Sequence, residues 1–154
     1  MSTTKNTILK LIKKNISIST AESCTGGLIA SAITRIAGAS KIFSSGIVCY
    51  SNKAKTKYLS ISKITLKKYG AVSSNVASEM VNNLFLKERT NICISTTGIA
   101  GPGGGNKKKP VGLVFVGIKF HDKTYVFQKN YKGSRLEIQR KTKEFVFKKI
   151  NQLI

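Results

Sequence analysis

Short runs rich in β-branched residues alternate along this chain with segments whose apolar residues recur at helical spacing. Such alternation predicts an α/β fold, because each helix buries its apolar stripe against a face of the sheet that the strands form. Two further strand-like runs flank a polar turn at His121 and Asp122, which predicts an antiparallel hairpin. We therefore expect a three-layer α/β/α sandwich with a mixed β-sheet.

The boundaries of these elements are predicted from periodicity and from turn residues. Ser134 and Glu137 have the spacing of a capping box, which predicts the start of the last helix. Because a hydrophobic content of 41% suffices for one core and no linker or repeat interrupts the pattern, we expect residues 1–154 to form a single domain. The expected helices cover residues 3–15, 27–38, 52–59, 62–70, 75–87 and a segment from residue 133, and the expected strands cover residues 16–20, 46–51, 91–98, 111–120 and 123–131.

No stretch of the chain approaches the roughly 18 consecutive apolar residues of a membrane span. Lysines interrupt the N-terminal segment, which therefore lacks the apolar core of a secretory signal. We expect a cytoplasmic protein without a membrane partner.

The formal net charge of +21 is extreme for one domain and by itself suggests a nucleic-acid partner. Nearly all of this charge comes from lysines, which are spread through every segment, and Lys107–Lys109 forms the one real cluster. Specific nucleic-acid surfaces are clustered, so the distribution favours lysines that solvate the surface over a dedicated nucleic-acid face.

The cysteines and the histidine exclude several kinds of site. Cys24, Cys49 and Cys93 are odd in number and far apart, and no two form a C-x-x-C pair, which argues against a disulfide framework and a zinc site. The single histidine, His121, lies in the expected hairpin turn and leaves a Ser-His-Asp triad incomplete. The sequence thus indicates no metal.

Two glycine-rich loops follow expected strands and are candidates for a ligand site. They are TAESCTGG, residues 20–27, and GIAGPGGG, residues 98–105. Neither matches the P-loop or the dinucleotide-binding fingerprint. A lone glycine loop is usually a tight turn, but two of them after apolar strands lie where α/β folds bind ligands. The first loop also leads into a helix, whose N-terminal N–H groups would favour negative charge.

The first loop offers two nucleophiles, Ser23 and Cys24, which as neighbours cannot both point at the same substrate atom. Either nucleophile would need a base, and lysine is the candidate base that this chain has in abundance. Lysine serves as the base in known Ser-Lys variants of nucleophilic catalysis. A lysine base must be neutral, so its pKa must fall well below about 10.4 through burial or nearby positive charge. The segment YSNKAK, where a strand gives way to a helix, is the best source of this base, and its residues leave Lys53 and Lys55 as rivals.

Together these motifs resemble the CinA C-terminal domain family, also called PncC, the nicotinamide-mononucleotide amidohydrolases. The resemblance extends over almost the whole chain, because TAESCTGG, YSNKAK, YGAVS, GIAGPGGG, KPVG and GSR stand in the family's order and at about its spacing. It implies hydrolysis of the carboxamide of nicotinamide mononucleotide to nicotinic acid mononucleotide and ammonia, without a cofactor. It also implies a homodimer.

The resemblance assigns roles to individual residues. It implies that Ser23 is the nucleophile, that Lys55 is the base, and that Tyr50 holds Lys55 or relays its proton. Glu22 would orient the loop or form a structural ion pair, and Arg135 would bind the substrate's phosphate, with Arg140 as a weaker candidate. The expected substrate-binding residues are Glu22, Cys24, Thr25, Gly26, Gly27, Gly101, Gly103, Gly104, Arg135 and Arg140, with the backbone N–H groups of residues 24–27 stabilising the oxyanion.

Two alternatives to an enzyme remain open from the sequence. One is a basic nucleic-acid-binding protein, which the charge and the family's association with competence and DNA damage would favour. The other is a catalytically silent nucleotide-binding domain, which would bind its ligand without releasing ammonia.

Overall fold

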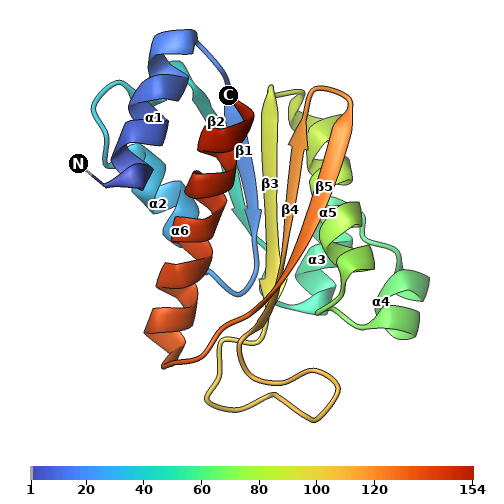
Figure 1. Ribbon diagram of the computed structural model, residues 1–154. Coiled ribbons are helices and arrows are strands. Elements are labelled where there is room, and N and C mark those ends of the chain that lie inside the picture. The colour runs from blue at the N-terminus through green and yellow to red at the C-terminus, as the bar shows by residue number, and fades with distance from the viewer. Residues whose placement is uncertain (1) are drawn as a thin grey trace.

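Strands and helices alternate along the chain as far as the third strand, and a strand hairpin and a long helix complete the fold (Figure 1). The computed structural model describes residues 2–154. In chain order the elements are α1 (Thr3–Lys14), β1 (Ile18–Glu22), α2 (Leu28–Thr34), the 3-10 turn η1 (Ala39–Lys41), β2 (Phe43–Val48), α3 (Asn52–Leu59), α4 (Lys63–Tyr69), α5 (Ser74–Glu88), β3 (Ile92–Gly98), β4 (Leu113–Phe120), β5 (Lys123–Asn130) and α6 (Arg135–Leu153).

The strands form one five-stranded sheet in the order β2-β1-β3-β4-β5. Strand β1 pairs in parallel with β2 on one side and with the central strand β3 on the other. The later strands run antiparallel, β3 against β4 and β4 against β5, and the last pair is the hairpin that turns at His121. The sheet is therefore mixed, as the sequence predicted.

Helices cover both faces of the sheet. In Figure 1, α1, α2 and α6 lie on one face, and α3, α4 and α5 lie on the other. Each face has its own apolar core, which includes Ile29 and Phe147 on the first face and Leu59 and Met80 on the second. The three-layer α/β/α prediction is confirmed, because the apolar stripes of helices far apart in sequence converge on the two faces of one sheet.

Two expected strands shift along the sequence. Strand β1 starts at Ile18 and continues to Glu22, because Asn15 ends α1 in a left-handed conformation and the amide of Ile16 still bonds to Leu11. Strand β2 runs from Phe43 to Val48 and not through residues 46–51. The amide of Cys49 still bonds the carbonyl of Glu22 in β1, and the chain then turns so that the hydroxyl of Ser51 accepts a hydrogen bond from the amide of Ala54 and caps α3.

The last helix begins where the sequence predicted. The amide of Glu137 donates to Ser134 Oγ at 3.3 Å, and the amide of Ser134 donates to Glu137 Oε2 at 2.6 Å, so both halves of the capping box form. The helix is long, with 19 residues, yet no helix within residues 2–154 is long and apolar enough to cross a bilayer.

One end of the sheet collects the loops that matter for function. Because β1, β2 and β3 are parallel, their carboxyl ends lie at the same edge. The segments that follow these strands, residues 23–27, 49–51 and 99–112, gather at the lower end of Figure 1, and the start of α6 lies beside them. This edge is where open α/β sheets usually bind ligands.

Candidate active site

Ser23 and Lys55, the predicted nucleophile and base, meet at this edge of the sheet. Ser23 is the first residue after β1, and Lys55 lies in the first turn of α3. Lys55 Nζ donates a hydrogen bond of 2.9 Å to Ser23 Oγ. Both side chains are buried, with exposed fractions of 5% for Ser23 and 1% for Lys55. The two groups are therefore close enough for direct proton transfer and are shielded from bulk water.

Burial controls the protonation of Lys55. Its Nζ also donates to the carbonyl oxygen of Cys49 at 3.0 Å and lies 3.5 Å from that of Tyr50. Desolvation lowers the pKa of Lys55 below its ordinary value of 10.5, against weaker opposing effects of the nearby Cys49 and Cys24. A lowered pKa favours the neutral amine that a base requires. Lys53, the rival base, is exposed on the surface of α3.

Cys24, the rival nucleophile, points into a different part of the molecule. Its side chain is 3% exposed and belongs to the apolar core beneath α1, α2 and α6. Burial raises the pKa of the Cys24 thiol to about 12, so the thiol stays protonated near neutral pH. All three cysteines are free and buried. The local geometry thus pairs the base with Ser23 and leaves Cys24 as a core residue.

Glu22 holds residues 23–27, the loop that carries the predicted nucleophile and is called the nucleophile loop below, from within. Its carboxylate accepts hydrogen bonds from the Thr25 hydroxyl at 2.6 Å and from the amides of Ile29 and Ala30 at 2.9 and 3.0 Å. It is 1% exposed, and within residues 2–154 it forms no ion pair. Of the two roles expected for Glu22, loop orientation matches this geometry. The amides of Ile29 and Ala30 in α2 are already occupied by this carboxylate, so these two N–H groups cannot serve a ligand.

Other backbone N–H groups of the loop are free to meet a developing oxyanion. The amide of Gly26 donates to the carbonyl of Ser23 at 3.0 Å. The amides of Cys24, Thr25 and Gly27 donate to no acceptor in the part of the chain that the structure describes. Gly26 and Gly27 have φ values of 58° and 98°, which only glycine adopts readily, so this tight turn depends on both of them.

Arg135, Tyr50 and Gly101 form the rim of the site. Arg135 Nη1 donates to the carbonyl oxygen of Gly101 at 2.6 Å, and Nη2 donates to the Tyr50 hydroxyl. The Tyr50 phenol therefore engages Arg135, and it is the carbonyl of Tyr50 that approaches Lys55. Gly101 has φ of 80°, and a Cβ there would lie 2.4 Å from a methyl group of Val111, so only glycine fits.

The structure does not bring every candidate into this group. Residues 99–112, which join β3 to β4, are called the glycine loop below. Gly103 and Gly104 lie on its exposed outer part. Arg140 forms an exposed ion pair with Glu144 at 2.7 Å, one turn along α6. Its guanidinium is thus engaged with a neighbouring carboxylate, unlike that of Arg135.

Two residues that sequence reasoning missed hold the nucleophile loop. The Thr96 hydroxyl bonds to the Thr25 hydroxyl at 2.8 Å, and the Thr96 carbonyl accepts from the amide of Ser23 at 3.0 Å. Gln139 Nε2 donates to the carbonyl of Cys24 at 2.9 Å. Gln139 lies four residues after Arg135, and this spacing places both on one face of a helix, which is a signal that the sequence contained.

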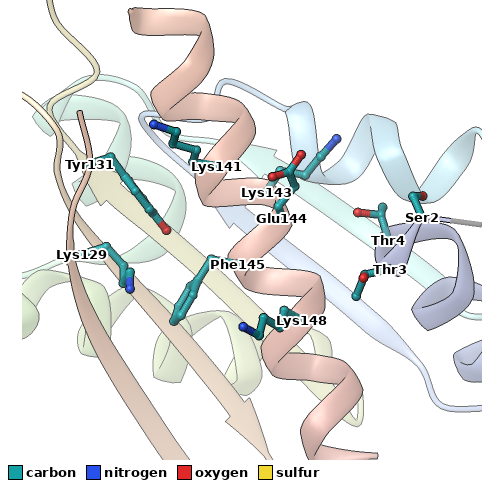
Figure 2. Close-up of a pocket in the computed structure, with 10 residues that line it drawn as sticks. All are labelled: Ser2, Thr3, Thr4, Lys129, Tyr131, Lys141, Lys143, Glu144, Phe145 and Lys148. Carbon is teal, nitrogen blue, oxygen red and sulfur yellow. The ribbon is translucent and has the colours of Figure 1, made fainter. Parts of the chain in front are cut away.

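A surface pocket of about 490 Å³ lies apart from these residues. Figure 2 shows Lys129 and Tyr131 on one side of α6 and Ser2, Thr3 and Thr4 on the other. No predicted site residue lines this pocket. Within residues 2–154, no group of three or more His, Cys, Asp or Glu side chains is arranged to hold a metal ion.

Comparison with known proteins identifies close relatives over the whole chain. The family model of the CinA C-terminal domain matches residues 1–154. A CinA-like protein of Fusobacterium nucleatum is 53% identical over 140 residues, which cover 89% of this chain and 34% of that protein. The chain spans about a third of the length of the curated relatives it matches.

Solved structures share the fold as well as the sequence pattern. The competence/damage inducible protein CihA of Agrobacterium tumefaciens superposes with a TM-score of 0.93 at 36% identity, over 99% of this chain and 96% of that one. A competence-damaged protein (CinA) superfamily protein of Escherichia coli superposes with a TM-score of 0.93 at 31% identity, over 99% of this chain and 88% of that one.

Proposed function

The chain belongs to the CinA C-terminal domain family, and from this premise we propose that it is an amidohydrolase that converts nicotinamide mononucleotide to nicotinic acid mononucleotide and ammonia. The observation that carries the proposal is the buried contact of 2.9 Å between Lys55 Nζ and Ser23 Oγ. A buried amine of lowered pKa beside a serine hydroxyl is the arrangement that a Ser-Lys mechanism needs.

The reaction proceeds through an acyl-enzyme. Ser23 Oγ attacks the carboxamide carbon and gives its proton to the neutral amine of Lys55. The tetrahedral intermediate collapses, and the Lys55 ammonium returns the proton to the leaving nitrogen, which departs as ammonia. A water molecule then attacks the ester on Ser23 and gives a proton to Lys55, the bond between the acyl carbon and Ser23 Oγ breaks, and Lys55 returns the proton to Oγ as the carboxylic acid is released. No other acid or base is needed.

The oxyanion of each tetrahedral intermediate is stabilised by the loop's backbone. The free N–H groups of Cys24, Thr25 and Gly27 are the available donors. They are preorganised, because Glu22, Thr96 and Gln139 together hold the loop through hydrogen bonds. The charge that develops in the transition state therefore meets fixed dipoles at little cost of reorganisation.

Arg135 is the best-placed partner for the substrate's phosphate. A guanidinium has five N–H donors, and Arg135 uses two of its nitrogens to bond Gly101 and Tyr50. The remaining donors are held in a fixed orientation at the rim, as bidentate recognition of phosphate requires. The exposed Lys107 and Lys108 in the glycine loop add positive charge to the same end of the molecule.

The proposal is tested by ammonia release from nicotinamide mononucleotide. We expect Ser23→Ala and Lys55→Met each to lower kcat by at least about 10³-fold, because each removes one half of the reacting pair. Lys53→Met, two residues from the base but exposed, is the matched control and should retain activity within about twofold.

Each outcome separates the proposal from its alternatives. Folded wild-type protein that binds the nucleotide without releasing ammonia would contradict the amidase and support a silent nucleotide-binding domain. Loss of activity in Lys53→Met but not in Lys55→Met would show that the base is misassigned.

A further inference from the structure

Gln139 connects α6 to the nucleophile loop. Its Nε2 donates a hydrogen bond of 2.9 Å to the carbonyl oxygen of Cys24, across 115 residues of sequence. Gln139 follows Arg135 by one helical turn, and the capping box at Ser134 fixes the start of this helix. The first turns of α6 therefore hold both the glycine loop, through Arg135, and the nucleophile loop, through Gln139.

The carbonyl that Gln139 holds belongs to the same peptide unit as the amide of Thr25. This peptide is trans, since the only cis bond in residues 2–154 joins Gly101 and Pro102, and in a trans peptide the C=O and N–H bonds point in opposite directions. A hydrogen bond that fixes the orientation of the Cys24 carbonyl therefore also fixes the orientation of the Thr25 N–H. That N–H is one of the free donors of the loop.

The layers of the fold indicate where this N–H points. The Cys24 carbonyl points toward α6, which lies on one face of the sheet, whereas α3, which carries Lys55, lies on the other (Figure 1). The Thr25 N–H therefore points away from α6, and Lys55 reaches Ser23 from α3 on the other face of the sheet. An oxyanion formed at Ser23 would lie on that side.

The turn bond from the Gly26 amide to the Ser23 carbonyl spans this peptide, but it bonds neither the Cys24 carbonyl nor the Thr25 N–H. Glu22 and the Thr96 hydroxyl bond the side chain of Thr25, and the Thr96 carbonyl bonds the amide of Ser23. Within residues 2–154, Gln139 is the one group that bonds the Cys24 carbonyl. Without it the peptide could rotate about its flanking bonds and turn its N–H away.

We propose that Gln139 is a positioning residue, which fixes the Cys24–Thr25 peptide so that the Thr25 N–H serves as an oxyanion donor for Ser23. This inference rests on the proposed function and extends it to a residue outside the Ser-Lys pair. Gln139 contacts neither substrate nor reacting atoms and acts only through the loop's backbone.

The test compares Gln139→Ala and Gln139→Glu with the wild type in the nicotinamide mononucleotide assay. Glutamate keeps the size of glutamine, but its carboxylate cannot donate to the Cys24 carbonyl. Loss of one oxyanion donor costs about 10²- to 10³-fold in kcat. We therefore expect a partial loss of activity in both variants, with kcat lowered about 10- to 100-fold and KM within about threefold of the wild-type value. Gln152→Ala, an exposed glutamine near the end of α6, is the matched control.

A second readout does not depend on the nicotinamide substrate. In phosphonylation by a fluorophosphonate, Ser23 Oγ bonds to phosphorus, fluoride leaves, and the serine proton passes to Lys55. The phosphonyl oxygen needs the same N–H donors, so intact-mass kinetics should show labelling slowed in both Gln139 variants.

The two readouts separate the two claims. Wild-type protein that labels at Ser23 but releases no ammonia would refute the amidase, and slower labelling of the Gln139 variants would still support the inference. A Gln139→Glu variant that hydrolyses nicotinamide mononucleotide and reacts with the fluorophosphonate at wild-type rates would overturn the inference about Gln139, because a residue needed only for its shape would tolerate this substitution. Labelling of the wild type no faster than that of Ser23→Ala would refute both.

Discussion

Lys55 has the most unusual environment of any single residue in this protein. It is the largest of the fully buried side chains, and its amine reaches Ser23 and the carbonyl of Cys49. A buried lysine that is not paired with a carboxylate is costly for a fold to retain, and such groups cluster at functional sites. The same burial that makes Lys55 a competent base also makes its charge state depend on pH.

Activity should therefore rise with pH. Desolvation lowers the pKa of Lys55, and only the neutral amine can accept the proton of Ser23. We expect kcat/KM to increase with pH and to level off above the pKa of Lys55, which burial lowers from the ordinary value of 10.5. A profile of kcat/KM from about pH 5 to pH 10 measures this. Activity that falls across that range would contradict a neutral lysine base.

The stability of the fold should change in the same direction. Between the lowered pKa of Lys55 in the folded protein and its ordinary 10.5 in the unfolded chain, the unfolded state binds more protons. The free energy of unfolding contributed by this residue therefore rises with pH through that window. Urea unfolding at several pH values should show the wild type gaining stability relative to Lys55→Met as pH increases.

At the scale of secondary elements, the junction between β1 and α2 depends on one carboxylate. Strand β1 is buried along its whole length, and Glu22 at its end turns back to bond the amides of Ile29 and Ala30 in α2. Helix α2 has no side-chain cap at Gly27, so Glu22 satisfies N–H groups that would otherwise be unpaired. The geometry of the nucleophile loop follows from this junction.

Replacing this carboxylate should destabilise the protein and disturb the loop. We expect Glu22→Ala to lower the free energy of unfolding by about 2–3 kcal/mol, because it leaves buried donors unpaired. Glu144→Ala, which breaks only the exposed pair with Arg140, should cost about 0.5 kcal/mol or less. Urea unfolding of both variants tests the difference, and equal losses would show that Glu22 is not a structural cap.

At the scale of the whole molecule, positive charge is distributed and not focused. Lysines lie on both faces of the fold, with the exposed Lys53 and Lys67 beside one surface pocket and the half-buried Lys129 and exposed Lys148 beside another. Lys107 and Lys108 lie in the glycine loop, which falls between Lys67 and Lys129 along the chain. This distribution is typical of lysines that solvate a surface.

Binding to DNA should accordingly be weak and non-specific. We expect any affinity for duplex DNA to fall by about 10³-fold or more between about 50 and 200 mM salt, because it arises from released counterions. Ser23→Ala should bind like the wild type. Fluorescence anisotropy over a salt series measures both effects. Sequence-specific binding that persists at the higher salt concentration would support the nucleic-acid alternative.

The sequence by itself predicted the layered fold, and through the family resemblance it supplied the proposed reactive residues. Periodicity predicted the α/β class, the hairpin and the capping box at Ser134, because these depend on local spacing. The motifs, through the family resemblance, selected Ser23 over Cys24 and Lys55 over Lys53. Element ends were less predictable: residues 46–51 look like one strand, but β2 ends at Val48 and Ser51 caps α3.

Only the tertiary structure decided how the site is supported. Ser23 and Lys55 are 32 residues apart, and parallel pairing of β1 with β2 brings them together. Gln139 reaches Cys24 across 115 residues, and Glu22 turns inward to α2 and away from any ligand. Contacts of this kind depend on which elements become neighbours in space, and local propensity and spacing carry no information about that.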